Sequence, residues 1–351
     1  MRPGASGGAE FPALLARLLA AARGEVDGAD VRAAFDAILA GSWTPVQVAA
    51  FAVALRMHGE SAEAIVSAAE AMRAAMTAVD HGLPVVVDTC GTGGDGAHTL
   101  NLSSAAAVVV AACGVVVAKH GNRSVSSRCG SADVVEALGI PVDVPPERQH
   151  EVLREAGITF LFAPAHHPAL RHAAQARREL GTRTIFNALG PLVNPARASH
   201  QLVGVYEDAL RPVAARALAR LGSRRAWVVR GEDGLDEVSP CAPTRVSELG
   251  EDGEVRERVV TPEDFGMTRG DRSAIAGGDA PSNAQALVAI LEGAGHAARD
   301  AVLLNAAAAL VVATGDEPRG AVERARKAID GGAARAVLDT WRRVARRVRG
   351  G

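Results

Sequence analysis

From residue 84 onward, short apolar β-like runs alternate with helical stretches, and this alternation restricts the fold more than any other feature of the sequence. The β-like runs cover residues 85–88, 115–118, 158–162, 201–206, 226–231 and about 244–248. Between most of them lie segments whose apolar residues recur at helical spacing. Such alternation is typical of right-handed β-α-β units. We therefore predict an α/β fold with a mostly parallel central sheet flanked by helices.

The first 80 residues show helical patterns and no β-like run. Residues 12–21, 31–40, 46–57 and 62–76 each carry apolar residues at intervals of three or four. Thr44, Pro45 and Gln47 favour a helix start before the third segment, and Ser61 favours one before the fourth. We predict a small all-helical N-terminal domain over residues 10–80, after a glycine-rich, disordered segment 1–9.

The remaining boundaries follow from the same patterns. Residues 81–167 and 201–348 are assigned to a large α/β domain, and helices at about 168–200 are expected to join the small helical domain. The chain has 351 residues, which is more than one compact core usually holds. Two domains are therefore expected.

Composition excludes several classes of protein. With 48% hydrophobic and 22% charged residues the chain is not a disordered one, and its net charge of −2 argues against a DNA-coating surface. The longest apolar run, residues 105–118, is shorter than the ~20 residues of a membrane span. Four cysteines without CxxC spacing are typical of reduced thiols. We expect a cytoplasmic protein that binds neither membranes nor nucleic acid.

The segment GTGGDG, residues 91–96, lies between the first β-like run and a helix predicted at about 103–113. Glycines let the backbone approach a ligand, and a helix N-terminus offers unpaired N–H groups, so the segment is typical of an anion site. A structural tight turn is the alternative. Neither the Walker spacing nor GxGxxG is present, which disfavours a P-loop or a dinucleotide site. Short polar side chains follow at Thr99, Asn101, Ser103 and Ser104.

A second polar segment, KHGNRSVSS at residues 119–127, follows the second β-like run and is predicted to begin a loop that ends at residue 130. It concentrates cations, an amide, an imidazole and hydroxyls. Because loops after parallel strands meet at one sheet edge, both segments should lie together. They predict a ligand with more than one phosphate. Lys119 and Lys327 are the two lysines among 38 basic residues, which suggests that Lys119 is retained for its own chemistry.

Acidic residues follow a later β-like run, at Asp233, Asp236 and Glu237. Adjacent carboxylates suit Mg²⁺, which binds one or two of them together with substrate phosphate oxygens, and Ser103 could add a ligand. A solvated acidic turn is the alternative. On a predicted helix, either Arg177 or Arg178 could pair with a substrate carboxylate, or both could be surface residues.

Two further segments are less informative. His166, His167 and His172 lack an HExxH motif and a nearby thiolate pair, so no metal site is predicted there. FNALGPLVNP, residues 186–195, contains too many helix and strand breakers for a regular element. We predict a structured crossing loop.

Together these segments closely resemble the anthranilate phosphoribosyltransferase family over roughly residues 11–340. The matching pieces, in the family's order, are GTGGDG (91–96), NLSS (101–104), KHGNRSVSS (119–127), GSADVVEALG (130–139), ARRELGTRTIFNALGPLVNP (176–195), DGLDEVS (233–239) and GGDAPSNA (277–284). The resemblance implies a nucleoside phosphorylase/phosphoribosyltransferase-like fold, a hinge between the domains and a homodimer formed through the helical domains. It also implies phosphoribosyl transfer from 5-phosphoribosyl 1-pyrophosphate to the amine of anthranilate, in tryptophan biosynthesis.

The resemblance also assigns residues. Anthranilate would contact Gly91, Asn122 and Arg177, whereas Mg²⁺ would bind Ser103, Asp236 and Glu237. Lys119, Asn122 and Arg177 would be the catalytic residues, with no general base assigned and His120 a weak candidate for one. The phosphoribosyl pyrophosphate shell would contain Gly91, Gly94, Asp95, Thr99, Asn101, Leu102, Ser103, Ser104, Lys119, His120, Gly121, Asn122, Arg123, Ser124, Val125, Ser126, Ser127 and Ser131. The chain departs from the family's commoner residues at His98, Ser104 and Cys129.

Two alternatives remain at this stage. A pyrimidine nucleoside phosphorylase has the same architecture, but the Lys119 segment lacks that family's serine-glycine-arginine phosphate signature. A noncatalytic nucleic-acid-binding relative would be expected to have a basic surface, which conflicts with the net charge.

Overall fold

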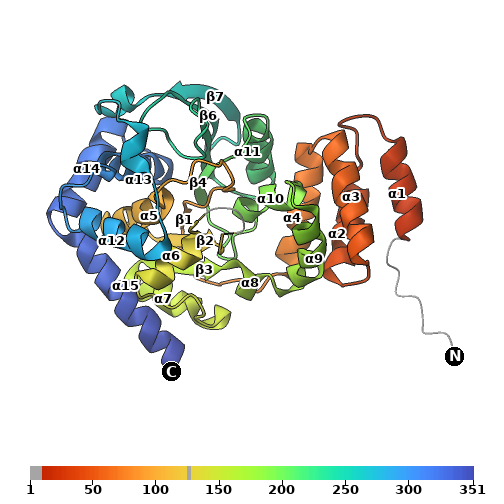
Figure 1. Ribbon diagram of the computed structural model, residues 1–351, viewed down its shortest axis with the longest axis horizontal. Helices are drawn as coiled ribbons and strands as arrows, with labels where there is room; N and C mark the ends of the chain where they lie inside the picture. The colour runs from red at the N-terminus through yellow and green to blue at the C-terminus, as the bar shows by residue number, and fades with distance from the viewer. Residues whose placement is uncertain (1–9, 125–127) are drawn as a thin grey trace.

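A computed structural model describes residues 10–124 and 128–351 (Figure 1). Residues 1–9, predicted to be disordered, lie outside the described residues, as do Val125, Ser126 and Ser127 of the predicted donor shell.

Four helices form the N-terminal part of the described chain, at one end of the molecule (Figure 1, red and orange). Helix α3 begins as predicted, because Thr44 Oγ1 accepts from Gln47 N at 3.4 Å and Gln47 Oε1 accepts from Thr44 N at 2.8 Å. Ser61 caps α4 by accepting from Ala64 N at 3.1 Å. The helices are α1 (Phe11–Ala20), α2 (Gly28–Leu39), α3 (Pro45–His58) and α4 (Ala62–Ala75).

In the described residues, seven strands form one sheet in the order β3-β2-β1-β4-β5-β6-β7. Pairing is parallel from β3 through β5 and antiparallel at β6 and β7, which confirms a mostly parallel sheet. Strand β7 was not predicted, because its VRERVV sequence carries alternating charges suited to an exposed edge. The strands are β1 (Val87–Asp88), β2 (Val117–Gly121), β3 (Ile158–Phe162), β4 (His200–Gly204), β5 (Arg225–Gly231), β6 (Thr244–Leu249) and β7 (Val255–Val260).

The strand order reverses at β1, which pairs with β2 on one side and with β4 on the other. The chain continues outward through β2 and β3 on the first side, and through β4 and β5 on the second. In open α/β sheets, ligands bind beyond the carboxyl ends of the strands at such a reversal. The segments that follow β1, β2, β4 and β5 therefore meet at the edge where a site is expected.

Helices cover both faces of this sheet (Figure 1). Helix α13 is almost entirely buried between the sheet and its neighbours, and Asn305 on it binds both the amide and the carbonyl of Val238. The helices of this part of the molecule, some of which pack on other helices, are α5 (Leu102–Ala112), α6 (Ser131–Ala137), α7 (Gln149–Ala156), α8 (Ala163–His166), α11 (Leu210–Arg220), α12 (Ala280–Leu291), α13 (Arg299–Thr314), α14 (Pro318–Asp330) and α15 (Ala333–Gly350).

In the described residues, no single helix is both long enough and apolar enough to cross a bilayer. One sharply bent pair, α13 with α14, meets the length and composition test only when the two helices are taken together.

Helices α9 (Arg171–Leu180) and α10 (Ile185–Ala188) pack against the N-terminal helices. The Phe186 and Phe35 rings lie 5.2 Å apart, and Ala173 and Ala176 are buried in the same apolar cluster. That cluster continues into α11, β4 and β5, so apolar contacts link the helical part to the sheet.

The prediction that residues 186–195 contain no regular element is wrong. Helix α10 and a 3₁₀ turn, Gly190–Leu192, form there. The Asn187 side chain accepts from Thr184 N at 3.0 Å, which supports a helix start in spite of the glycine and prolines that follow.

Candidate active site

Lys119 was expected in a loop, but it lies inside strand β2. Parallel pairing with β3 continues through Lys119, His120 and Gly121, so the connecting segment starts only at Asn122. The polar composition misled the prediction, because a buried strand can hold a cation whose donors are satisfied. Lys119 is 2% exposed, and its Nζ donates to Thr89 O at 3.1 Å, Thr89 Oγ1 at 3.3 Å and Ser103 Oγ at 3.3 Å. Its ammonium is therefore fixed between the end of β1 and the start of α5.

The Glu237 carboxylate lies close enough to this ammonium for the two charges to interact, and Asp236 and Asp95 interact with one another beside Glu237. Glu237 Oε1 accepts from Ser103 N at 3.2 Å, and Asp236 N donates to Asp95 Oδ2 at 3.4 Å. Burial raises the pKa of Glu237 to about 7, although the Lys119 charge opposes this shift. Burial, followed by the charges of Asp95 and Glu237, raises the pKa of Asp236 well above its ordinary value. Raised pKa values mean that the protein surroundings disfavour the ionised form of both carboxylates.

The glycine-rich segment faces the same acidic residues. A Cβ on Gly91 would lie 3.2 Å from Gly204 O and 3.3 Å from Asp236 Oδ2, so glycine keeps open the space beside that carboxylate. Gly94 has a φ of +79°, and its carbonyl accepts from the Arg183 guanidinium. Asp95 Oδ1 accepts from Ala97 N at 3.0 Å. The segment is therefore a turn that hydrogen bonds from Arg183 and within residues 95–97 fix beside the acidic cluster.

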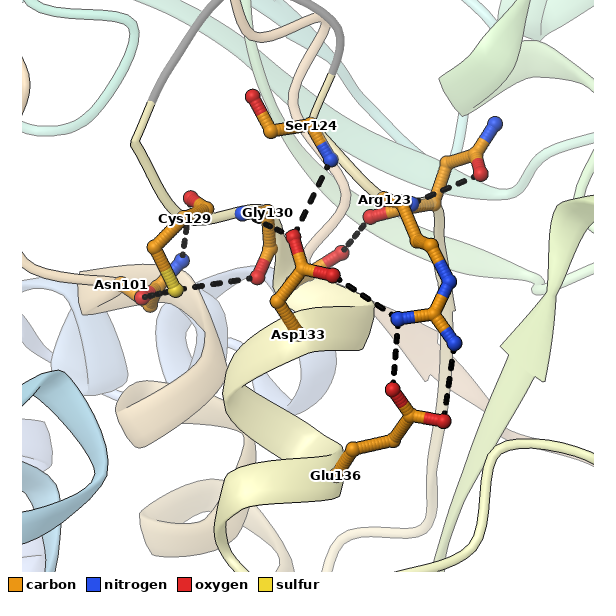
Figure 2. Close-up of polar contacts among 9 residues, drawn as sticks. Asn101, Arg123, Ser124, Cys129, Gly130, Asp133 and Glu136 are labelled. Atoms are coloured by element: carbon orange, nitrogen blue, oxygen red, sulfur yellow. Dashed lines mark hydrogen bonds and ion pairs between the residues drawn. The ribbon is translucent and has the colours of Figure 1, made fainter. Parts of the chain in front are cut away.

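The residues around the start of α5 have different environments. Asn101 Oδ1 accepts from Asn283 Nδ2 at 3.0 Å and from Cys129 Sγ at 3.4 Å, the latter drawn in Figure 2. Leu102 is completely buried in the apolar core. The backbone of Thr99 forms an isolated antiparallel β-bridge with Ala276. Ser104 Oγ is buried and makes no hydrogen bond with the described residues.

His120 lies on β2 with its ring directed to a backbone carbonyl. Its Nδ1 lies 2.9 Å from Gly190 O, and since a carbonyl can only accept, Nδ1 carries the proton. Burial, followed by the charge of His167, lowers the pKa of His120 to about 3. His120 is therefore neutral near pH 7 and adds no positive charge for a phosphate.

The segment between β2 and α6 is closely packed at both ends. Asn122 O accepts from Ser131 Oγ at 3.2 Å and from Ala132 N at 3.1 Å. A Cβ on Gly121 would lie 2.3 Å from Ser131 Oγ, which explains the glycine. Arg123 forms ion pairs with Asp133 and Glu136 (Figure 2).

Arg177 and Arg178 have different environments on α9. Arg178 is exposed, whereas Arg177 is partly buried with its guanidinium carbon 5.5 Å from the Phe186 ring centroid. Burial lowers the pKa of Arg177. Among residues 10–124 and 128–351, no carboxylate forms an ion pair with Arg177, and no hydrogen bond joins it to Lys119 or Asn122. A partly buried guanidinium without an acidic partner is suited to an anionic ligand.

The predicted site residues thus fall into groups. Ser103, Lys119, Asp95, Asp236 and Glu237 come together, and the Arg123 segment and Arg177 lie outside their hydrogen-bond network. Thr89, Arg183 and Asp133 were not singled out from the sequence. Arg183 and Asp133 do lie within matching segments, 176–195 and 130–139, which was the available signal.

His166 and the acidic cluster contain side-chain types that bind metal ions in other proteins. His166 Nδ1 lies 2.8 Å from Thr77 O. Over the described ranges, no three His, Cys, Asp or Glu side chains form a ready-made metal cluster. A magnesium ion at Asp236 and Glu237 would therefore need further oxygen ligands from a bound molecule.

Comparison with known proteins identifies the family. Residues 83–335 match the model described as "Glycosyl transferase family, a/b domain", and residues 12–76 match "Glycosyl transferase family, helical bundle domain". The chain is 57% identical over 302 residues to anthranilate phosphoribosyltransferase of Myxococcus xanthus, which covers 86% of this chain and 89% of that protein. It is 52% identical over 311 residues to the Moorella thermoacetica protein of that name, covering 88% and 91%.

Solved structures agree with this result. Anthranilate phosphoribosyltransferase of Thermus thermophilus superposes with a TM-score of 0.88 at 40% identity, covering 95% of this chain and 99% of that one. The Saccharomyces cerevisiae protein, solved with phosphoribosyl pyrophosphate and Mg, gives a TM-score of 0.88 at 29% identity, covering 96% and 99%. The chain therefore belongs to the anthranilate phosphoribosyltransferase family.

Proposed function

We propose that this enzyme transfers the phosphoribosyl group of phosphoribosyl pyrophosphate to the amine of anthranilate, releasing pyrophosphate and N-(5-phosphoribosyl)anthranilate in tryptophan biosynthesis. The observation that carries the proposal is the buried Lys119 ammonium, which binds Ser103 at the start of α5, where Ser103 also binds Glu237, next to Asp236 and the glycine-rich turn. A cation and a helix N-terminus suit phosphate, and carboxylates suit the metal that accompanies a diphosphate.

The acidic residues fit Mg²⁺ in their chemistry and in the space beside them. Asp236 and Glu237 are hard oxygen donors whose pKa values are raised first by loss of water around them and then by neighbouring carboxylates, and Gly91 leaves room beside Asp236. Ser103 and these two carboxylates would hold the ion. Bound Mg²⁺ would neutralise charge on the departing pyrophosphate.

Arg177 and Asn122 suit the acceptor. The Arg177 guanidinium could take the anthranilate carboxylate in a bidentate pair, and the Asn122 amide and Gly91 backbone would complete this subsite. The acceptor nitrogen would then form a bond to ribose C1 as the C1–O bond to pyrophosphate breaks. The proton that the nitrogen then loses passes to water, because no general base is assigned. A neutral arylamine is already nucleophilic, so positioning and electrostatic stabilisation supply the catalysis.

The donor subsite would consist of Lys119 and the turn of residues 91–96, together with the other donor-shell residues named from the sequence. Within this set, His120 would contribute shape and one acceptor nitrogen, Nε2, because its proton lies on Nδ1. Leu102 would act through packing and its backbone, since its side chain belongs to the core. A donor phosphate would have to compete with Asp133 and Glu136 for the Arg123 guanidinium.

The exposed apolar residues support a homodimer formed through the helical domain. Four of the five large apolar side chains found exposed in the described residues lie on α1 and α3: Leu19, Val46, Val53 and Met57. Exposed apolar side chains gathered on neighbouring helices are typical of protein–protein contacts. The division into a helical domain at 10–80 and an α/β domain at 81–167 and 201–348 belongs to this proposal. So does a cytoplasmic location, which the four free cysteines suit.

The direct test mixes the protein with phosphoribosyl pyrophosphate, Mg²⁺ and anthranilate and follows anthranilate fluorescence. We expect fluorescence to fall only when all three are present. No loss of fluorescence, combined with phosphorolysis of pyrimidine nucleosides, would instead support the nucleoside phosphorylase alternative. A salt-dependent gel shift without turnover would support the nucleic-acid-binding alternative.

A further inference from the structure

One carboxylate on α6, that of Asp133, connects both limbs of the segment between β2 and α6. Its Oδ2 accepts from Gly130 N at 2.8 Å and from Ser124 N at 3.4 Å (Figure 2). Ser124 lies on the limb that leaves β2, whereas Gly130 lies on the limb that enters α6. A single side chain therefore fixes the separation of the two limbs.

The two limbs are in direct contact where Gly130 lies against Arg123 and Ser124, and we call this crossing the neck of the segment. A Cβ on Gly130 would lie 2.2 Å from Ser124 N and 2.7 Å from the carbonyl carbon of Arg123. No other residue type could occupy position 130 without moving the opposite limb. The backbone amides that Asp133 binds are thus held in a close-packed crossing, in which a small shift of one limb moves the other.

The same carboxylate also holds Arg123. Arg123 Nη1 donates to Asp133 Oδ1 at 3.0 Å and to Glu136 Oε2 at 2.6 Å, and Nη2 donates to Glu136 Oε1 at 2.9 Å. Although burial opposes the shift, the hydrogen bonds from Gly130 and Arg123 lower the pKa of Asp133. Asp133 is therefore ionised near pH 7 and can bind all three groups.

The two acids differ in what they touch. Asp133 binds both backbone limbs and one guanidinium nitrogen, whereas Glu136 forms hydrogen bonds, among the described residues, only with the guanidinium, in a fork. The side chains of Arg123 and Glu136 are 49% and 41% exposed, so water competes with their ion pair. The pair therefore contributes little to the free energy of folding. A phosphate could replace Glu136, since it offers the same bidentate geometry with more charge.

We infer that Asp133 is a positioning residue for the donor, which holds the segment's neck and Arg123 in place, while Glu136 competes with donor phosphate for the Arg123 guanidinium. This inference rests on the proposed donor site. It assigns opposite effects to two acids that lie one turn apart on the same short helix.

The test compares Asp133→Asn with Glu136→Gln. Asp133→Asn removes the charge that holds Arg123 and weakens the hold on the two amides, so the KM for phosphoribosyl pyrophosphate should rise about tenfold. Glu136→Gln frees Arg123 and leaves both amides bound, so that KM should fall about two- to threefold. In both variants kcat and the anthranilate KM should stay within about twofold of wild type.

Glu151→Gln is the matched control, because Glu151 on α7 also binds an arginine, Arg148, through two oxygens. It should change neither KM. A general structural role for Asp133 would instead lower kcat and raise both KM values together, which would overturn the inference. An unchanged or raised donor KM in Glu136→Gln would also overturn it. Glu136 binds no backbone amide in the part of the chain that the structure describes, so this variant stays informative if Asp133→Asn fails to fold. Absence of wild-type turnover would refute the proposed function rather than this inference.

Discussion

The Lys119 ammonium lies 3.3 Å from the Ser103 hydroxyl, so a hydrogen bond joins the middle of strand β2 to the start of helix α5 across 16 residues of sequence. Ser103 also donates its amide to Glu237, which follows a different strand. These contacts place a cation, a helix N-terminus and a partly buried acid within one network. Such a network is suited to a diphosphate and the metal ion that accompanies it.

Lys119→Arg should raise the KM for phosphoribosyl pyrophosphate about tenfold or more. Lys119 is almost fully buried with Nζ bound to Thr89 and Ser103, and a planar guanidinium would displace those partners. Steady-state kinetics with varied donor measures the effect. Lys327→Arg replaces the other lysine of the chain on α14 and should leave the donor KM unchanged; equal effects of the two would refute a specific role for Lys119.

Arg177→Ala should raise the anthranilate KM at least about tenfold, because a charge-assisted bidentate pair is lost. The donor KM should change little. Arg178→Ala removes an exposed neighbour on the same helix and serves as the control. If both KM values rise equally in Arg177→Ala, this arginine does not bind the acceptor.

When phosphoribosyl pyrophosphate is present, added Mg²⁺ should raise the Tm of the protein more at pH 8 than at pH 5. Burial raises the pKa of Glu237 to about 7 from an ordinary 4.5, so the folded protein holds this proton more tightly than the unfolded chain. The resulting stability is complete below about pH 4.5 and is lost as pH rises towards 7. Bound Mg²⁺ should restore it above pH 7, where the carboxylate is ionised.

Thermal unfolding with and without Mg²⁺ measures this difference. The magnesium-induced rise in Tm should be small at pH 5 and larger at pH 8, and Asp236→Asn should reduce it. Glu232→Gln changes an exposed, surface-paired acid and should not affect it. A magnesium effect of the same size at both pH values would contradict the assignment of the carboxylates.

Met57→Asp should convert a dimer into monomers. Met57 is 74% exposed on α3, among the apolar side chains that α1 and α3 present, and a buried unpaired charge at an interface is costly. Val259→Asp alters a similarly exposed apolar residue on edge strand β7 and should leave the assembly unchanged. Sedimentation velocity distinguishes the outcomes, and a monomeric wild type would refute the dimer.

The sequence predicted the fold more fully than the site. Strand–helix alternation and the capping residues Thr44 and Ser61 act locally, so the elements they specify could be located from the sequence. Edge strand β7 was missed because exposed strands carry little apolar signal. Lys119 was predicted in a loop because a charged side chain is costly to bury. The partners that offset this cost, Thr89 and Ser103, are distant in sequence, so no local pattern reveals them.

The same limit applies to the donor segment. Arg123 was predicted as a donor-shell cation, but no local pattern shows that Asp133 and Glu136 hold its guanidinium. Arg183 was missed for a similar reason, since its contact with Gly94 joins segments 89 residues apart. Long-range polar contacts such as these depend on the completed fold.

The most direct test of the proposed site is a crystal structure of the protein with phosphoribosyl pyrophosphate and Mg²⁺. We predict the pyrophosphate between the turn of residues 91–96 and Lys119, with magnesium bound by Ser103 and the Asp236–Glu237 carboxylates at about 2.1 Å. A donor bound away from Lys119, or magnesium that contacts neither carboxylate, would contradict the account.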